Sequence, residues 1–334
     1  MDTNSSRGRR AGPGRGGTMV AASTAAVLAL SLFGCTDREP GTDASARPEK
    51  QQRTSYFTGM PGRSGPVLAV KIDNVPPARP HTGLGAADIV YVEQVESGLS
   101  RILAVFSSQL PPRVGPVRSA RESDIALLRQ FGRPALAYSG AQSALRPLID
   151  AAPMAALPPG KAPGAFVRSG DRPAPHNLYV RPDRALAAAD DVSDASDIGM
   201  RFGPAPDEGR PVDEHTVRYP SARFTFTWSA EQKRWLVAFD GTAARTTDGG
   251  PLGAATVVVQ YTQVRPSQFR DRSGSVSPYT ETVGSGTALV LRDGRAHDAR
   301  WQRTTEGGDT VFTDTAGERL NFARGQVWVL LTAG

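Results

Sequence analysis

The sequence predicts an α+β protein, with a mixed α/β first domain whose sheet is covered by helices and a smaller β-rich second domain. Two observations predict this class. Between residues 66 and 150, short continuous apolar runs alternate with helix-like patterns, whereas after residue 203 apolar residues alternate one by one in paired segments. Continuous apolar runs indicate strands that are buried on both faces, so helices are expected over the first sheet.

The first 35 residues predict an export signal that ends in a lipidated cysteine. Four arginines precede an apolar stretch over residues 19–33, which is too short for a comfortable membrane span. Cys35 is the only cysteine of the chain, and it stands where bacterial lipoprotein signals place the residue that receives diacylglycerol. We therefore expect residues 1–34 to be removed and the protein to be extracytoplasmic, anchored to the cell membrane through lipid on Cys35. The alternative is a plain secretory signal with an incidental cysteine, and the Arg9-Arg10 pair leaves twin-arginine export open.

Charge and composition argue against a nucleic-acid-binding protein. The formal net charge of the whole chain is +6, and it falls to +3 without residues 1–34, because these hold four arginines and one aspartate. The basic character therefore belongs largely to the leader, and no nucleic acid partner is expected. With Cys35 assigned to lipid, no cysteine remains for disulfides or thiolate metal sites.

The domain boundaries follow from changes in composition. Residues 35–64 are rich in Pro, Gly, Ser, Thr and charge, and are expected to form a flexible tether. Residues 65–205 are expected to form the α/β domain and residues 206–334 the β-rich domain. We find no repeat of fixed period.

The first domain is expected to contain four buried strands and three helices. The strands are predicted at residues 67–73, 88–93, 102–106 and 135–138. A helix is predicted to start at Ser119, which with Glu122 fits a capping box, and further helices are predicted at residues 142–150 and 186–190.

The second domain is predicted to be built from hairpins. Alternating aromatic residues over 224–228 and 235–239 indicate a hairpin with an aromatic face, and strands follow at residues 256–261, 288–291 and 327–331. Asp293-Gly294 predicts a hairpin turn. The four tryptophans could stack on sugars, but alternating Trp and Phe on hairpins are more often core residues, and we expect the core role.

Polar residues concentrate at the ends of the predicted strands, where ligands usually bind in a helix-covered sheet. Three segments carry them, and a fourth polar stretch follows the long loop over 151–175. The candidate ligand-binding residues are Asp73, Asn74, Arg79, Arg101, Arg118, Ser119, Arg121 and Asn177.

The segment over residues 115–121 has the clearest physical chemistry. With Ser119 as N-cap, the free amides of the first helical turn would lie beside Arg118 and Arg121, a combination suited to a carboxylate or phosphate. The alternative is that Glu93 or Glu96 already occupies this position, which would make an internal ion-pair network.

Glu93, Glu96 and His176 are the candidate catalytic residues. Paired carboxylates are typical of glycosidases, but residues three apart on a strand point to opposite sides unless the strand ends between them. His176 lies among polar and turn-forming residues, whereas His81 is a weaker candidate and His215 and His297 are expected at the surface. The scattered histidines show no ligand spacing, so neither a metal nor a cofactor is expected.

The same segments resemble the YerB-like family of bacterial lipoproteins, whose two characteristic domains are of unknown function (domain of unknown function 3048). The resemblance rests on residues 72–74 (IDN), 78–84 (ARPHTGL), 88–91 (DIVY), 95–101 (VESGLSR), 115–121 (GPVRSAR) and 174–179 (APHNLY), and more weakly on 235–237 and 325–329. The resemblance implies an exported, membrane-anchored protein with an α/β and a β-rich domain. It supplies no reaction.

Three functions follow as hypotheses. The first is a cell-envelope binding module whose polar cleft takes an anionic or glycan-like ligand, such as a peptidoglycan fragment or an acidic segment of a partner protein. The second is a hydrolase or lyase of cell-wall polymer that uses Glu93 or Glu96 with His176. The third is an envelope scaffold that recruits partner enzymes through an exposed apolar surface of the second domain.

Overall fold

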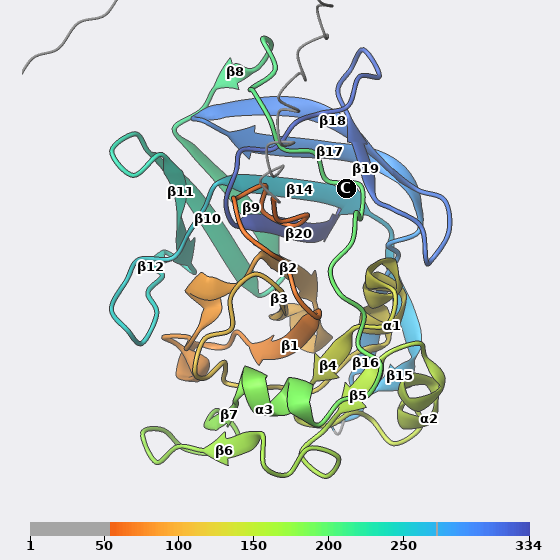
Figure 1. Cartoon of the computed structure of the whole chain (residues 1–334). Coiled ribbons are helices and arrows are strands. Elements are labelled where there is room, and N and C mark those ends of the chain that lie inside the picture. The colour runs from red at the N-terminus through yellow and green to blue at the C-terminus, as the bar shows by residue number, and fades with distance from the viewer. Residues whose placement is uncertain (1–53, 272) are drawn as a thin grey trace, which may run out of the picture. The chain divides into compact units, whose positions relative to one another are not determined.

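One mixed sheet runs through both halves of the chain (Figure 1). The computed structural model describes residues 54–271 and 273–334, which belong to one compact unit. In sheet order the strands are β19 (Val311–Thr313), β18 (Arg295–Arg303), β17 (Gly284–Arg292), β14 (Thr256–Thr262), β20 (Val327–Ala333), β2 (Ile89–Gln94), β3 (Ser100–Phe106), β1 (Leu68–Asp73), β4 (Ala135–Ala137) and β5 (Ala155–Leu157). The short strand β8 (Arg210–Pro211) pairs with β18.

The last strand of the chain joins the two halves. β20 pairs in parallel with β14 on one side and with β2 on the other, so the sheet passes from the second predicted domain into the first without a break. The division of the chain at residues 205 and 206 remains a prediction about its organisation. The strands predicted at 67–73, 88–93, 102–106, 135–138, 256–261, 288–291 and 327–331 all belong to this sheet and are confirmed.

The aromatic hairpin is confirmed and covers one face of the large sheet. β10 (Ala222–Ser229) pairs with β11 (Arg234–Phe239), and β9 (Glu214–Tyr219), β12 (Thr242–Ala243) and β13 (Gly253–Ala254) complete this second sheet. The ring of Trp328 on β20 lies 5.9 Å from that of Phe226 and 6.3 Å from that of Phe239. Trp235, Trp301 and Trp328 are buried and Trp228 is half-buried, so the expected core role of the tryptophans is confirmed.

The helices are short and cover little of the sheet, so the predicted helix-covered sheet is not what the structure shows. They are α1 (Glu122–Leu128), α2 (Arg146–Ala151) and α3 (Pro182–Ala187). α1 and α2 bury Leu128 and Ile149 in the same apolar cluster on one face, and α3 buries Ala185 on the other. Loops and β-hairpins provide most of the cover: β6 (Phe166–Arg168) pairs with β7 (Leu178–Val180), and β15 (Val264–Arg270) pairs with β16 (Val276–Thr280). The protein is sheet-dominated, and it is α+β only in this coarse sense.

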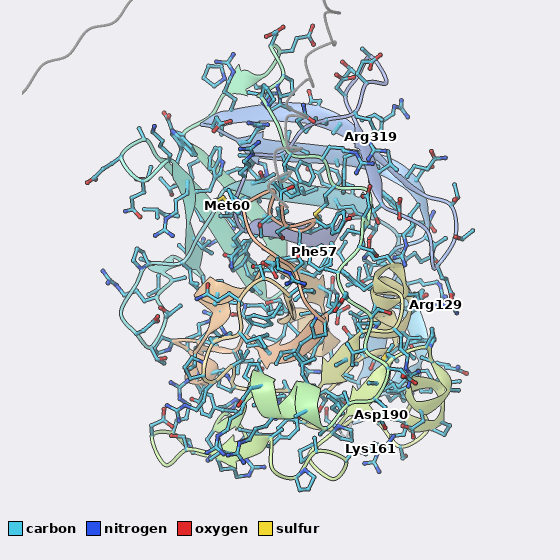
Figure 2. The ribbon with its side chains drawn as sticks, in the orientation of Figure 1. Phe57, Met60, Arg129, Lys161, Asp190 and Arg319 are labelled. Carbon is cyan, nitrogen blue, oxygen red and sulfur yellow. The ribbon has the colours of Figure 1, made fainter. Side chains whose placement is uncertain are left out.

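The predicted tether over residues 35–64 is wrong from residue 54 onward. Phe57 is fully buried, and its ring lies 5.4 Å from that of Phe131 in an edge-to-face contact. This segment crosses the sheet in orange-red in Figure 1, and Figure 2 labels Phe57 and Met60 on it. One buried ring contributes several kcal/mol, so Phe57 helps to hold this largely polar segment on the core. Residues 35–53, and the predicted signal peptide with Cys35, lie outside the described residues.

Phe57→Ala should destabilise the full chain by about 3–5 kcal/mol, because it removes a fully buried ring that cannot be replaced. The matched control is Tyr56→Ala, which removes an exposed ring at the neighbouring position and should change stability by no more than about 0.5 kcal/mol. Urea unfolding of the two variants measures the difference. If both variants lose equally little stability, the prediction of a flexible tether up to residue 64 would stand.

Candidate functional site

The candidate site lies at one edge of the sheet. β1 and β2 both run antiparallel to β3, and β4 runs parallel to β1, so β1, β2 and β4 end at the same edge, where β3 begins. Two of the four polar segments that the sequence singles out, those that begin at Asp73 and at Glu93, start at this edge. The backbone of Arg118 then joins it, because its N–H donates to the carbonyl of Lys71 at 2.8 Å.

Polar residues occupy the last positions of one sheet face. Across the strands, Arg101 on β3 pairs with Asp73 on β1 and with Glu93 on β2. Lys71 lies two residues before Asp73 and therefore points to the same side of β1. This face is apolar further along, with Ala69 in the core, so the polar end is a distinct feature of the sheet.

A buried ion triad lies directly behind the site. The ammonium group of Lys71, fully buried, contacts the carboxylates of Glu93 and of Asp124, the latter at 2.7 Å. Asp124 also accepts the backbone N–H of Arg121 at 2.7 Å. Burial raises the pKa of Glu93, an effect that the charge of Lys71 opposes and that of Asp124 reinforces. The triad therefore holds the Arg121 end of the loop over residues 118–121, while the backbone bond to the carbonyl of Lys71 holds the Arg118 end.

In front of this loop lies a large hollow, here called the arginine cleft. Its volume is about 1,030 Å³, and it is continuous with a smaller hollow of about 180 Å³ through shared lining residues, among them Glu96 and Arg101. Five stretches line it: the turn between β2 and β3 with the start of β3 (Glu96 and Arg101), the loop over 118–122, the loop and helix start over 139–146, the β6–β7 hairpin and the β15–β16 hairpin. Its lining includes six arginines and three carboxylates: Arg101, Arg118, Arg121, Arg146, Arg168 and Arg270 against Glu96, Glu122 and Asp271.

Three of these residues, Arg101, Arg118 and Arg121, form the inner arginines. Arg121 pairs with Glu96 at 2.6 Å, and Arg118 approaches the carboxylate of Asp73 at 3.2 Å. Within the described chain, Arg101 has no carboxylate within 4.0 Å and donates only to the carbonyl of Ser119, at 3.1 Å. Burial, together with the neighbouring charge of Arg121, lowers the pKa of Arg101 to about 10. Arg101 is therefore a nearly buried cation without a direct counter-ion.

Glu96 is held by groups from both halves of the chain. Besides Arg121, it accepts a hydrogen bond from the hydroxyl of Ser277 on β16. Burial alone would raise the pKa of Glu96, but the hydrogen bond and charge of Arg121 and the hydrogen bond from Ser277 outweigh it and lower the pKa. Glu96 is therefore an ionised partner of arginine near neutral pH.

The structure separates Glu93 from Glu96. β2 ends at Gln94, yet Glu93 turns into the buried triad, where it is 2 % exposed, while only Glu96 lines the cleft. His176 lies beside the cleft, because its Nδ1–H donates to the carboxylate of Asp73 at 2.9 Å. His81 is fully buried with its pKa lowered to about 4 by burial, and its Nε2–H donates to the carbonyl of Asp73.

Ser119 is not the N-cap of the helix, contrary to the prediction. Arg121 is the N-cap, and the capping carboxylate is Asp124, three residues further on. α1 has only seven residues, so its first turn is no anion site, although Ser119 itself lines the cleft. Ser119 and Glu122 have the spacing of a capping box. Asp124, however, pairs with the buried Lys71 and accepts the N–H of Arg121, so the helix starts two residues later than predicted.

Asn74, Arg79 and Asn177 do not face the cleft. Arg79 pairs with Asp240 of the second sheet at 2.8 Å, stacks over Phe239 and donates to the side chain of Asn74. Asn177 accepts from Arg168 at 2.7 Å and donates to the carbonyl of Ser169, which closes the β6–β7 hairpin. Of the predicted ligand-binding residues, Asp73, Arg101, Arg118, Ser119 and Arg121 thus share one place.

Sequence reasoning missed Lys71 and the whole β15–β16 contribution. Lys71 is one of four lysines of the chain and interrupts an apolar strand, a signal of a paired buried charge. Arg270 and Asp271 lie about 150 residues beyond the inner arginines, in a turn without a motif. Only the tertiary structure could place them in the cleft.

Other features of the described residues add no further chemistry at this site. No three His, Cys, Asp or Glu side chains among residues 54–271 and 273–334 converge to hold a metal ion. Among the same residues no helix has the length and apolar character needed to cross a bilayer. A separate hollow of about 600 Å³ is lined by residues 204–210, β18 and the turn after β19, with acidic and basic side chains mixed. His297 lines it but is 5 % exposed, so its expected surface position is wrong.

Comparison with known proteins places this architecture in a family. The models of the N-terminal and C-terminal domains of a protein of unknown function, DUF3048, match residues 57–195 and 215–329. A relative named "Putative lipoprotein YerB", from Bacillus subtilis (strain 168), is 32% identical over 317 residues, covering 89% of this chain and 90% of the relative. The chain belongs to the DUF3048 family. The resemblance that the sequence motifs indicate is thereby confirmed.

The fold of this DUF3048 protein is also that of a solved structure. The crystal structure of the YerB protein from Bacillus subtilis superposes with a TM-score of 0.71 at 22% identity, covering 84% of this chain and 97% of the other. This likeness supports the sheet-dominated architecture.

Glu96→Gln should lose stability at neutral pH and lose less as the pH falls. Because the folded pKa of Glu96 is below its ordinary value of 4.5, its ionised form stabilises the fold above that value and this contribution disappears as the pH falls through the folded pKa. Urea midpoints of the wild type and the variant from about pH 7 to about pH 3 should therefore converge. Glu318→Gln, at an exposed carboxyl, controls for the lost charge, and a constant difference would contradict the prediction.

Lys71→Met should destabilise the DUF3048 protein by about 3–5 kcal/mol, because it leaves Glu93 and Asp124 buried without their cation. Lys161→Met removes an exposed lysine paired with Asp150 and should cost no more than about 1 kcal/mol. Chemical denaturation compares the two. Similar small losses would show that the triad does not hold the loop.

Proposed function

We propose that this DUF3048 protein is a lipid-anchored binding module of the cell envelope whose arginine cleft takes an anionic group of an envelope polymer. The observation that carries the proposal is the imbalance of charge in the cleft. Arg101 is nearly buried, lacks a direct counter-ion among the described residues and opens onto a hollow of about 1,030 Å³. A guanidinium group in this setting gains from a phosphate or carboxylate, because bidentate, charge-assisted hydrogen bonds replace lost hydration.

Arg118 and Arg121 support the same ligand. The Nε of Arg118 lies 3.2 Å from the carboxylate of Asp73, without the geometry of a hydrogen bond, and the Nε of Arg121 is buried without a hydrogen-bond partner in the described structure. In this proposal Arg101 takes most of the charge of the ligand, while Arg118, Arg121 and Ser119 orient it. Asp73 holds Arg118 and His176 in place and is a positioning group.

The hydrolase hypothesis has less support. A general acid needs a carboxyl whose pKa is raised toward neutrality and which faces the substrate. Glu96 faces the cleft but its pKa is lowered by Arg121, and Glu93 has a raised pKa but lies in the sealed triad. The pair formed by His176 and Asp73 is the remaining acid/base group beside the cleft. The scaffold hypothesis needs an exposed tryptophan surface, whereas the tryptophans are mostly buried.

The anchoring part of the proposal rests on the leader and on the relative. The chain has its single cysteine at position 35, after a basic and apolar leader, and the similar Bacillus subtilis protein carries the word lipoprotein in its name. Attachment through Cys35 would place the cleft within reach of peptidoglycan, of other envelope glycans and of envelope proteins.

The test is co-sedimentation of the full chain with purified cell-wall sacculi, with released fragments measured in the same samples. Arg101→Gln and Arg118→Gln should weaken binding by about tenfold or more, because each removes a charge-assisted hydrogen bond worth roughly 1.5–3 kcal/mol. Arg300→Gln removes an exposed arginine outside the cleft and should bind like the wild type.

Two outcomes would overturn the proposal. If the wild type releases fragments and His176→Gln or Glu96→Gln abolishes this release, the protein is an enzyme. Sedimentation that is the same for wild type and for both cleft variants would show that the arginine cleft does not bind the wall.

A further inference from the structure

Three more arginines line the same cleft and play no part in the function proposed above. These rim arginines are Arg146 at the start of α2, Arg168 at the end of β6 and Arg270 at the end of β15. All three are exposed, unlike the inner arginines, and three separate stretches of chain supply them. Their gathering around one hollow is therefore a product of the tertiary structure.

The rim arginines have no acidic partners. Across the described residues, none of them lies within 4.0 Å of a carboxylate oxygen. Each donates only to a neutral oxygen: Arg146 to the carbonyl of Ala141 at 3.4 Å, Arg168 to the side chain of Asn177 at 2.7 Å and Arg270 to the carbonyl of Gly274 at 3.0 Å. Some other exposed arginines do form ion pairs, such as Arg129 with Glu306.

The carboxylates of the cleft are already engaged. Glu96 pairs with Arg121, and Glu122 accepts the hydroxyl of Ser267. Asp271 accepts the backbone N–H groups of Ser273 and Ser275, each at 2.9 Å, and these bonds with the Ser273 hydroxyl lower its pKa. The rim arginines therefore keep their charge for an anion from outside the chain.

The cleft is also too large for one small anion. Its volume of about 1,030 Å³ is at the upper end of sites that enclose whole organic ligands, roughly 300–1,000 Å³. Apolar side chains, Leu145, Leu178 and Phe269, line it together with the arginines. The lining thus offers two sets of cations and an apolar surface.

We infer that the rim arginines form a second anionic subsite, so that the arginine cleft takes a chain-like ligand with at least two phosphate or carboxylate groups. One group binds the inner arginines and another binds the rim arginines. This inference rests on the function proposed above, because it needs the inner arginines to bind the first group. Phosphodiester and polycarboxylate chains share the chemistry that it requires.

The test is isothermal titration of the full chain with orthophosphate, with inorganic polyphosphate chains of increasing length and with oligoglutamates. Wild-type affinity should rise by about tenfold or more from orthophosphate to chains long enough to reach both subsites. In the triple variant Arg146→Gln, Arg168→Gln, Arg270→Gln, the ratio of the affinity for long polyphosphate to the affinity for orthophosphate should fall toward one. Arg118→Gln should weaken orthophosphate and polyphosphate together, and Arg300→Gln should leave the ratio at its wild-type value.

The outcomes separate the two proposals. If orthophosphate binds but chain length has no effect, or if the triple variant keeps the wild-type ratio, the second subsite is wrong and the inner site stands. If neither the phosphate series nor the oligoglutamates bind, both proposals fall. A rise in affinity with chain length in either series supports the second subsite, and the series that binds more tightly identifies the kind of anionic group.

Discussion

The structure depends on the position of β20 between β2 and β14. Both neighbours pair with it in parallel, and the strand is buried from Val327 to Thr332, so the end of the chain forms the middle of the sheet. Trp328 on this strand packs against the aromatic hairpin, and its indole N–H donates to Gln326. Because β20 ties the halves together, β15 and β16 can reach the edge where β1 and β2 end. The β15–β16 side of the arginine cleft therefore depends on this pairing.

A second constraint is electrostatic. The sheet edge brings several cations into one region, and the chain pairs only some of them with carboxylates. Lys71 is neutralised inside by Glu93 and Asp124, and Arg121 is neutralised by Glu96. Arg101 and the rim arginines are left without such partners among the described residues. The fully buried Lys71 is paired, because an unpaired buried charge is costly, whereas Arg101 and the rim arginines line the hollow without a carboxylate partner.

Part of the site could be predicted from the sequence, because apolar runs that end in polar residues mark the ends of strands. Asp73, Glu96 and Arg101 lie at or beside the end of a predicted strand, and Arg118 and Arg121 flank the predicted start of a helix. All five line the hollow or its smaller continuation. The prediction that Glu93 is a catalytic candidate missed its buried partner Lys71, because a strand pattern does not reveal which residues face each side of the sheet. Arg79 was misjudged for a similar reason: its partner, Asp240, lies in the second sheet, about 160 residues away.

By itself, the sequence determined the family, the positions of the main strands, the aromatic hairpin and the core role of the tryptophans. These features depend on local periodicity and on motifs, which a chain carries in consecutive residues. The tertiary structure decided that one sheet runs through both halves, that Phe57 is buried in the core, that α1 starts at Glu122, and that six arginines meet in one cleft. Each of these rests on contacts between residues far apart in the chain, and no local pattern encodes such contacts.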